Sequence, residues 1–113
     1  MIKFSIVITT KNRIADLKKT LISLKDILER KDVELLICDD ASTDGTHLFL
    51  RDKYSNHTLV FNQKSKGLIY NRNLLNDKAK GAYLISLDDD LNFLTEEPLE
   101  KIDLFFKKNP KAA

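Results

Sequence analysis

The chain has 113 residues, of which 42% are hydrophobic and 32% are charged, and its formal net charge is +2. This length predicts a single domain over residues 1–113 with a real hydrophobic core, and the composition excludes a disordered chain. The nearly balanced charge argues against a nucleic-acid groove, so we expect no nucleic-acid partner.

Two features of the sequence predict the cellular compartment of the protein. The single cysteine, Cys38, excludes an internal disulfide and favours a reducing compartment. No apolar run approaches the roughly 20 residues that a membrane-spanning helix needs, and residues 1–5 lead into a strand-like pattern and not into a signal peptide. We therefore expect a cytoplasmic protein without a membrane span, either free or peripheral to the inner face of the membrane.

The first half of the chain alternates between strand and helix patterns. Ile6 to Ile8 form a β-branched run that predicts a strand buried on both faces, as in a parallel sheet. Apolar residues at spacings of three and four then predict one amphipathic helix from about Ile14 to Arg30. A second strand over residues 33–38 ends on Asp39-Asp40, and residues 41–45 have the composition of a turn.

The second half continues this alternation. A helix is expected through Leu48, Leu50 and Tyr54, and a third strand over residues 58–61. A third helix is predicted over residues 68–78, after a loop that contains Gly67.

A fourth strand is predicted over residues 82–87, and Gly81 before it stands where a helix would need a left-handed cap. A last helix is predicted over residues 97–107. The whole pattern predicts right-handed βαβ units and an α/β, Rossmann-like fold, with a mostly parallel four-stranded sheet and helices on both faces.

Carboxylates follow two of the predicted strands: Asp39 and Asp40 after the second, and Asp88, Asp89 and Asp90 after the fourth. Ligands of open parallel sheets bind outside the carboxyl ends of the strands, so these five side chains are expected on one rim. Any single aspartate there is ordinarily a turn or cap residue. Five together predict a polar binding site.

The type of site follows from the ligands. Carboxylates without histidine or thiol neighbours favour Mg²⁺ or Mn²⁺, with substrate phosphates completing the coordination shell. Arg13 and Arg72 are candidates to neutralise those phosphates. No glycine-rich phosphate loop is present, which disfavours NAD binding and P-loop chemistry.

Four segments resemble family 2 glycosyltransferases. Residues 5–13 resemble the opening strand and loop of that family, and residues 34–46 its second strand and acidic loop. Gly67 with Asn71-Arg72-Asn73 is similar to its Gly…Ala-Arg-Asn helix. Residues 81–90 resemble the strand that delivers its Asp-x-Asp motif. Two positions depart from the pattern, since Asn71 replaces the usual Ala and Leu91 replaces a common Asp.

The resemblance implies a GT-A fold and a metal-dependent enzyme that uses Mn²⁺ or Mg²⁺ and a nucleotide-diphosphate sugar, most often a UDP-sugar. The implied reaction is inverting glycosyl transfer in the synthesis of a cell-surface polysaccharide or glycoconjugate. The implied substrate-binding residues are Thr9, Lys11, Asn12, Arg13, Asp39, Asp40, Arg72, Asp88 and Asp89, with Asp90 as the metal ligand.

The resemblance also distributes roles among these residues. The loop from Thr9 to Arg13 would border the base, and Asp39 would accept a hydrogen bond from it. Arg72 would lie near the diphosphate, and Asp88 or Asp89 would contact the ribose.

In the family, the general base and the acceptor surface follow the Asp-x-Asp motif, and this chain ends about twenty residues after it. We therefore expect a truncated GT-A fold: a donor-binding half that is inactive alone and has no assignable general base. Its open sheet edge would favour self-association.

Three alternatives remain at this stage. A receiver-like phosphoacceptor domain fits the size, but its acidic pair would follow the first strand, where this chain has Thr9-Thr10. A nucleotidyltransferase would normally have a glycine-rich loop after its first strand, and this chain has no such loop there. A fragment that binds nucleotide without turnover is not separable from the enzyme by sequence.

Overall fold

The computed structural model describes residues 2–88. The strands are β1 (Phe4–Thr10), β2 (Val33–Asp40), β3 (Thr58–Asn62) and β4 (Tyr83–Asp88). The helices are α1 (Ile14–Ser23), α2 (Lys25–Leu28), α3 (Thr46–Lys53) and α4 (Leu68–Lys78). The helix expected over residues 97–107, and Asp89 and Asp90, lie outside the described residues.

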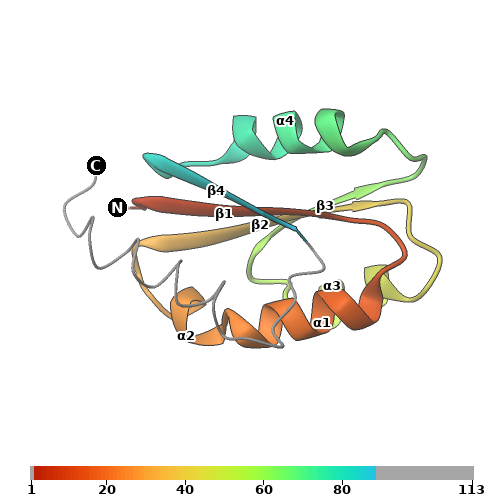
Figure 1. Cartoon of the computed structure of the whole chain (residues 1–113), viewed down its shortest axis with the longest axis horizontal. Helices are drawn as coiled ribbons and strands as arrows, with labels where there is room; N and C mark the ends of the chain where they lie inside the picture. Colours follow the sequence, from red (N-terminus) through yellow and green to blue (C-terminus); the bar gives the residue numbers. More distant parts are fainter. Residues whose placement is uncertain (1, 89–113) are drawn as a thin grey trace.

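The four strands form one parallel sheet in the order β3-β2-β1-β4. Figure 1 shows α1, α2 and α3 below this sheet and α4 above it. The first two crossovers step outward from β1, and the third returns across the sheet to place β4 on the other side of β1. Strand order therefore reverses beside β1, where open α/β sheets bind their ligands. The prediction of a parallel α/β sheet with helices on both faces is confirmed.

The core lies mainly between the sheet and the lower helices. Phe4, Ile6 and Ile8 of β1 are fully buried there against Leu17 and Leu21 of α1. A smaller cluster lies under α4 and contains the following buried residues: Val7, Leu36, Cys38 and Leu75. Cys38 is thus a core residue with a free thiol. Burial, with the nearby charges of Asp40 and Asp39, raises the pKa of its thiol to about 11.

The single helix expected from Ile14 to Arg30 is wrong, because α1 ends at Ser23 and α2 begins at Lys25. At Leu24 the backbone N–H is shared between the carbonyls of Thr20 and Leu21, at 3.1 and 3.2 Å. Such sharing tightens a helix locally towards 3₁₀ geometry. The apolar stripe nevertheless continues through the break, since Leu24 and Ile27 are buried.

The expectation that Gly81 is a left-handed helix cap is also wrong. The helix before it ends at Lys78 with an extended residue, Ala79, and the glycines with positive φ are Gly45 and Gly67 among the described residues. Gly81 instead packs against β1, where an added Cβ would lie 2.5 Å from the Ser5 Oγ and 2.8 Å from its backbone nitrogen. This glycine permits close approach of two backbones.

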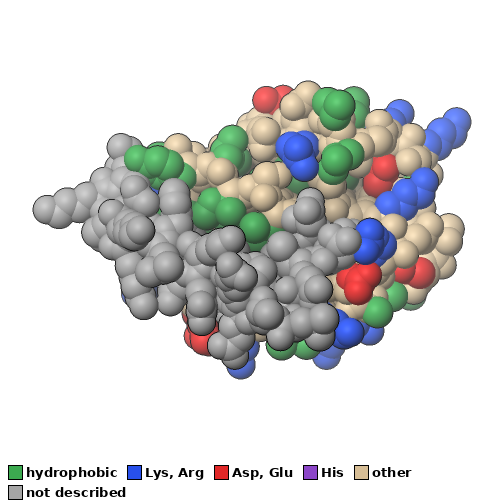
Figure 2. Space-filling view, in the orientation of Figure 1, with side chains coloured by type: hydrophobic (Ala, Val, Ile, Leu, Met, Phe, Trp, Pro, Cys, Tyr) green, Lys and Arg blue, Asp and Glu red, His purple; other side chains and the backbone are tan. Residues whose placement is uncertain are grey.

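Several large hydrophobic side chains are exposed on α4 and β4. Figure 2 shows hydrophobic side chains over α4 and β4, and the large exposed ones on these elements are Leu68, Ile69, Tyr70 and Leu84. Within residues 2–88, no helix has both the length and the apolar character needed to cross a bilayer.

Candidate functional site

A cavity of about 350 Å³ opens at the carboxyl end of the sheet, between the ends of β1 and β2 and the start of α4. Its lining residues are Thr9, Thr10, Lys11, Arg13, Asp40, Ser65, Gly67, Leu68 and Asn71. Lys11 and Arg13 bring positive charge, and the first turn of α4 adds the positive end of its helix dipole. The cavity therefore suits a negatively charged ligand.

Asp40 anchors the loop that forms one wall of this cavity. Its Oδ1 accepts hydrogen bonds from the Asn62 side chain (3.0 Å) and the Lys66 backbone N–H (2.7 Å). Its Oδ2 accepts from the Ser65 hydroxyl (2.7 Å) and the Gly67 backbone N–H (3.2 Å). Burial alone would raise the pKa of Asp40, but these four hydrogen bonds outweigh it and hold the pKa well below its usual range. Asp40 is therefore an ionised residue that positions the start of α4.

Asp39 and Asp40 do not share a surface, because both belong to β2 and neighbouring strand residues point to opposite faces. Asp40 lines the cavity. Asp39 is not among the lining residues, is only 2% exposed, and accepts a hydrogen bond from the Ser42 backbone N–H at 3.2 Å. Of the two carboxylates, Asp40 is therefore the one that borders the cavity.

A second polar contact extends from Asp40 into α4. The Asn62 side-chain nitrogen donates to Asp40 and also to the Asn71 Oδ1, at 2.7 Å. Asn71 is 1% exposed and lines the cavity. Asn71, which stands where the resembling family usually has alanine, is thus part of the cavity wall.

The loops after β1 and β2 are held together by Asn12. Its backbone N–H donates to the Ser42 hydroxyl (2.9 Å), and its Oδ1 accepts from the Thr43 backbone N–H (2.7 Å). Asn12 has a φ of 53°, a left-handed conformation that asparagine tolerates well. The Asn12 side chain therefore fixes the two loops, while Lys11 and Arg13 on either side of it line the cavity.

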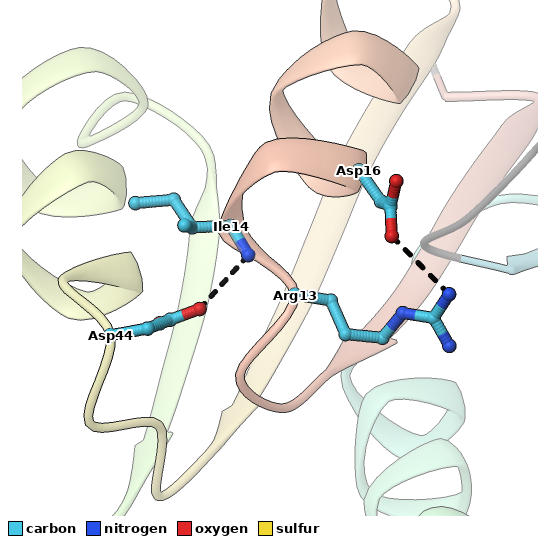
Figure 3. A network of polar contacts seen from close by, with 4 residues as sticks. All are labelled: Arg13, Ile14, Asp16 and Asp44. Atoms are coloured by element: carbon cyan, nitrogen blue, oxygen red, sulfur yellow. Dashed lines mark hydrogen bonds and ion pairs between the residues drawn. The ribbon is translucent and has the colours of Figure 1, made fainter.

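Asp44 joins the starts of two helices (Figure 3). Its Oδ2 accepts from the backbone N–H of Ile14, the first residue of α1, at 3.0 Å. Its Oδ1 accepts from the backbone N–H and hydroxyl of Thr46, the first residue of α3. Asp44 therefore caps a helix thirty residues away in the sequence as well as the helix that follows it.

Arg13 and Arg72 have different surroundings. Arg13 lines the cavity and forms an exposed ion pair with Asp16, with 3.3 Å between the guanidinium and the carboxylate (Figure 3). Arg72 lies in α4 outside the cavity lining, and its buried Nε has no hydrogen-bond partner among residues 2–88.

The metal-binding expectation concerns the end of β4. Asp88 stands opposite Thr9 in the sheet, and Asp89 and Asp90 follow it outside the described residues. Among residues 2–88, no cluster of three or more His, Cys, Asp or Glu side chains could hold a metal ion. Within the described residues, Asp40 already accepts four hydrogen bonds, and the expected metal ligand Asp90 lies outside them.

Sequence reasoning did not find three residues of the cavity wall and its support, namely Asn62, Ser65 and Thr10. Asn62 and Ser65 lie in a polar segment with no motif, and only the fold brings them to Asp40. Thr10 stands next to the predicted Thr9 and is buried at the end of β1.

Comparison with known proteins places this geometry in a family. The family model for glycosyl transferase family 2 matches residues 5–113. The chain is 39% identical over 71 residues to chondroitin synthase of Escherichia coli, covering 61% of this chain and 10% of that protein. It is 38% identical over 95 residues to "Putative glycosyltransferase EpsE" of Bacillus subtilis (strain 168), covering 77% of this chain and 33% of that protein.

Solved structures show the same fold. The mannosyltransferase PcManGT from Pyrobaculum calidifontis, in complex with GDP-Man and Mn²⁺, superposes with a TM-score of 0.74 at 20% identity, covering 92% of this chain and 32% of that one. Residues 1–349 of S. aureus TarS superpose with a TM-score of 0.74 at 26% identity, covering 95% and 33%. TarS 1–349 in complex with UDP-GlcNAc gives a TM-score of 0.70 at 25% identity, covering 95% and 32%.

These comparisons agree with the fold. The neighbours are GT-A glycosyltransferases, so the predicted fold class is confirmed. The chain spans a third or less of each of these proteins. Because the family model matches nearly its whole length, the chain belongs to glycosyl transferase family 2.

Proposed function

We propose that the cavity at the carboxyl end of the sheet binds a nucleotide-diphosphate sugar, as the donor site of a metal-dependent, inverting glycosyltransferase. The observation that carries this proposal is the cavity itself, where Lys11, Arg13 and the first turn of α4 meet. A diphosphate is the ligand group that such a combination of cations and helix N-terminus suits best.

The ligands of the neighbours support this choice. PcManGT is in complex with GDP-Man and Mn²⁺, and TarS 1–349 with UDP-GlcNAc or UDP. For this chain we propose a UDP-sugar, because TarS is the more similar of the two in sequence. The acceptor product is proposed to be a cell-surface polysaccharide or glycoconjugate, in keeping with the match to a chondroitin synthase.

The residues that border or support the cavity each have a role in this proposal. Thr9, Lys11 and Arg13 border the nucleotide, Asn12 holds their loop, and Asp40 positions the opposite wall. Asp39 supports the turn behind the cavity, which differs from the direct contact with the base that the family resemblance implies.

Arg72 and residues 88–90 complete the proposed donor site. Arg72 balances phosphate charge, and Asp88 and Asp89 are proposed to contact the ribose. Asp90 would hold Mn²⁺ or Mg²⁺, which supplies charge neutralisation for the departing diphosphate. No general base is assigned within the chain, and we propose that it lies in a part of the enzyme that follows the donor site.

The proposed location is the cytoplasm, at the membrane's inner face or free of it. Self-association is proposed through β4, which pairs with β1 alone among the described strands and carries the half-exposed Leu84. Light scattering at high concentration tests this, and a monomer at all concentrations would contradict it.

Titration calorimetry with UDP in the presence of Mn²⁺ tests the donor site. We expect saturable binding that EDTA weakens and that Asp90→Ala weakens by at least tenfold. Asp52→Ala, which removes an exposed carboxylate from α3, is the matched control and should bind as the wild type does. Absence of UDP and GDP binding with Mn²⁺ present, or equal binding by Asp90→Ala, would refute the proposal. Turnover of a labelled UDP-sugar in the complete enzyme would separate a transferase from a binding fragment.

A further inference from the structure

The first turn of α4 turns its apolar side chains to solvent. Leu68 and Tyr70 are each 53% exposed and Ile69 is 75% exposed, whereas the next residue, Asn71, is 1% exposed. A surface helix ordinarily buries its apolar side and leaves its polar side in water. The first turn of α4 has the reverse arrangement, so core packing in the described part of the chain does not account for these three apolar side chains.

The backbone that carries these side chains is fixed in place. Asp40 accepts hydrogen bonds from the Ser65 hydroxyl and from the backbone N–H groups of Lys66 and Gly67, directly before α4. Every residue from 63 to 70 is nevertheless exposed. The apolar side chains are thus held outward on an anchored segment, and a partner can bind them without first ordering it.

The same surface is positively charged. Lys64 and Lys66 are exposed, form no ion pair within residues 2–88, and lie in a stretch, residues 54–76, that contains no Asp or Glu. Figure 2 shows Lys and Arg side chains beside the hydrophobic ones over α4. We define the α4 patch by five exposed residues: Lys64, Lys66, Leu68, Ile69 and Tyr70. Its complement is an apolar surface that carries negative charge.

The helices on the opposite face of the sheet lack this combination (Figure 1). Their large exposed hydrophobic residues, Ile22 and Leu48, are single side chains on separate helices. Carboxylates also lie among their cations, since α1 and α2 each have an aspartate in the first turn and Lys53 lies 3.9 Å from Asp52. Charge complementarity to an anionic surface therefore favours the α4 patch.

We propose that the α4 patch docks the protein on an anionic lipid bilayer. Lys64 and Lys66 bind headgroup phosphates, while Ile69 and Tyr70 enter the headgroup region, where apolar and aromatic side chains are favourable. Side chains that protrude suit a bilayer, which deforms around them, whereas a rigid protein partner would need a matching pocket. Leu68 also lines the donor cavity, so docking brings the mouth of that cavity close to the bilayer. This proposal goes beyond the donor site and does not depend on it.

Co-sedimentation of the 113-residue chain with vesicles, in the absence of nucleotide, tests the proposal. Vesicles of phosphatidylcholine alone are compared with vesicles of equal parts of phosphatidylcholine and phosphatidylglycerol. We expect binding to the mixed vesicles to be at least about tenfold tighter, because each lysine near an anionic surface contributes about fivefold. This difference should shrink as the salt concentration rises, because exposed charges are screened.

Two variants test the patch itself. Ile69→Ser should weaken binding to the mixed vesicles by about tenfold, because it removes the most exposed apolar side chain of the patch. Lys64→Gln combined with Lys66→Gln should weaken it by about twentyfold and abolish most of the preference for anionic lipid. None of these three residues lines the donor cavity, so UDP affinity should keep its wild-type value.

Each variant has a matched control on the opposite face. Leu48 is 75% exposed, as Ile69 is, and also lies in the first turn of a helix, α3. Lys25 and Lys53 line a hollow between α1 and α3, and replacing both by Gln removes the same charge as the double variant of the patch. Leu48→Ser and the Lys25→Gln, Lys53→Gln double variant should bind vesicles as the wild type does. Thermal unfolding of every variant shows that the domain is folded.

The outcomes are distinct. Absence of binding of the folded wild type to the mixed vesicles overturns the proposal and leaves the α4 patch to a protein partner. Equal binding to both kinds of vesicle, or unchanged binding by the patch variants, also overturns it. A loss of binding in the control variants overturns it by placing the docking surface on the opposite face. Failure of the wild type to bind UDP in calorimetry refutes the donor site alone.

Discussion

The two ends of the sheet differ in how closely they are packed. At the amino end, the Glu34 carboxylate accepts hydrogen bonds from the Ser5 hydroxyl (2.6 Å) and the Lys80 backbone N–H (2.5 Å), and Gly81 packs against β1 without space for a methyl group. At the carboxyl end, Asp40 and Asp44 also join distant segments, but a cavity of about 350 Å³ opens beside Asp40.

Backbone strain follows the same division. The residues of positive φ within the described chain are Asn12, Ala41, Gly45 and Gly67, and all lie in loops at the carboxyl end. Strained backbone persists where surrounding contacts fix it, commonly at functional sites. The amino end thus stabilises the domain, whereas the carboxyl end holds open the cavity at which we propose the donor site. Substitutions at the two ends should therefore separate stability from binding.

The largest effect on stability is expected from Gly81→Ala at the amino end. The new Cβ would lie 2.5–2.9 Å from atoms of Ser5 and Phe4, two of them in the backbone, so β4 must shift. We expect a loss of about 3 kcal/mol or more in the free energy of unfolding, measured by urea denaturation. Lys80→Ala is the control and should change stability little. UDP affinity of the folded variant should stay at the wild-type value, and a tenfold loss of affinity at full folding would contradict the division.

Asp40→Ala should affect both stability and binding. Four donors lose their acceptor, so we expect a loss of about 2–3 kcal/mol in the free energy of unfolding and a weakening of UDP binding as the start of α4 moves.

The same substitution has a defined pH dependence. The folded-state pKa of Asp40 lies below its unfolded value, so its stabilisation is complete above about pH 4 and is lost as the pH falls through the folded-state pKa. Denaturation of wild type and variant at pH 7 and pH 3 measures this. The difference between them should shrink at the lower pH, and a constant difference would show that Asp40 acts without its charge.

Asp44→Ala should have a smaller effect, about 1–2 kcal/mol, because it removes the cap of α1 and the hydrogen bonds to Thr46. Asp16→Ala is the matched control. The Asp16 carboxylate lies in the first turn of α1, the helix that Asp44 caps, but it forms an exposed ion pair with Arg13 and caps no helix. Urea denaturation of both variants tests the assignment. Equal stability of the two would mean that Asp44 does not join the helices in solution.

The smallest expected change is a gain in stability. Ala41 has a φ of 62°, which is unfavourable for alanine and free for glycine. Ala41→Gly should raise the free energy of unfolding by up to about 1 kcal/mol, seen as a small increase in Tm. A decrease would mean that the loop after β2 is held by packing of the Ala41 methyl group.

The strands were predictable because β-branched runs such as Ile6 to Ile8 carry a local signal. The role of Gly81 was not, because the close approach to Ser5 joins residues 76 apart in the sequence. The break at Leu24 has no proline or glycine to mark it. Asp39 and Asp40 were expected after the second strand, whereas β2 includes both and thereby turns their side chains to opposite faces. Local patterns thus predicted the elements and the edge at which the cavity opens, whereas the cavity wall depends on the packing of distant loops.

The most direct test of the central claim is an NMR titration of the ¹⁵N-labelled protein with UDP and Mg²⁺. We predict that amide shifts change for Thr9 to Arg13, Gly67 and Asn71 around the cavity, and that those of Ser5, Glu34 and Gly81 stay in place. Shift changes centred on the amino end, or none at either end at saturating nucleotide, would contradict the account.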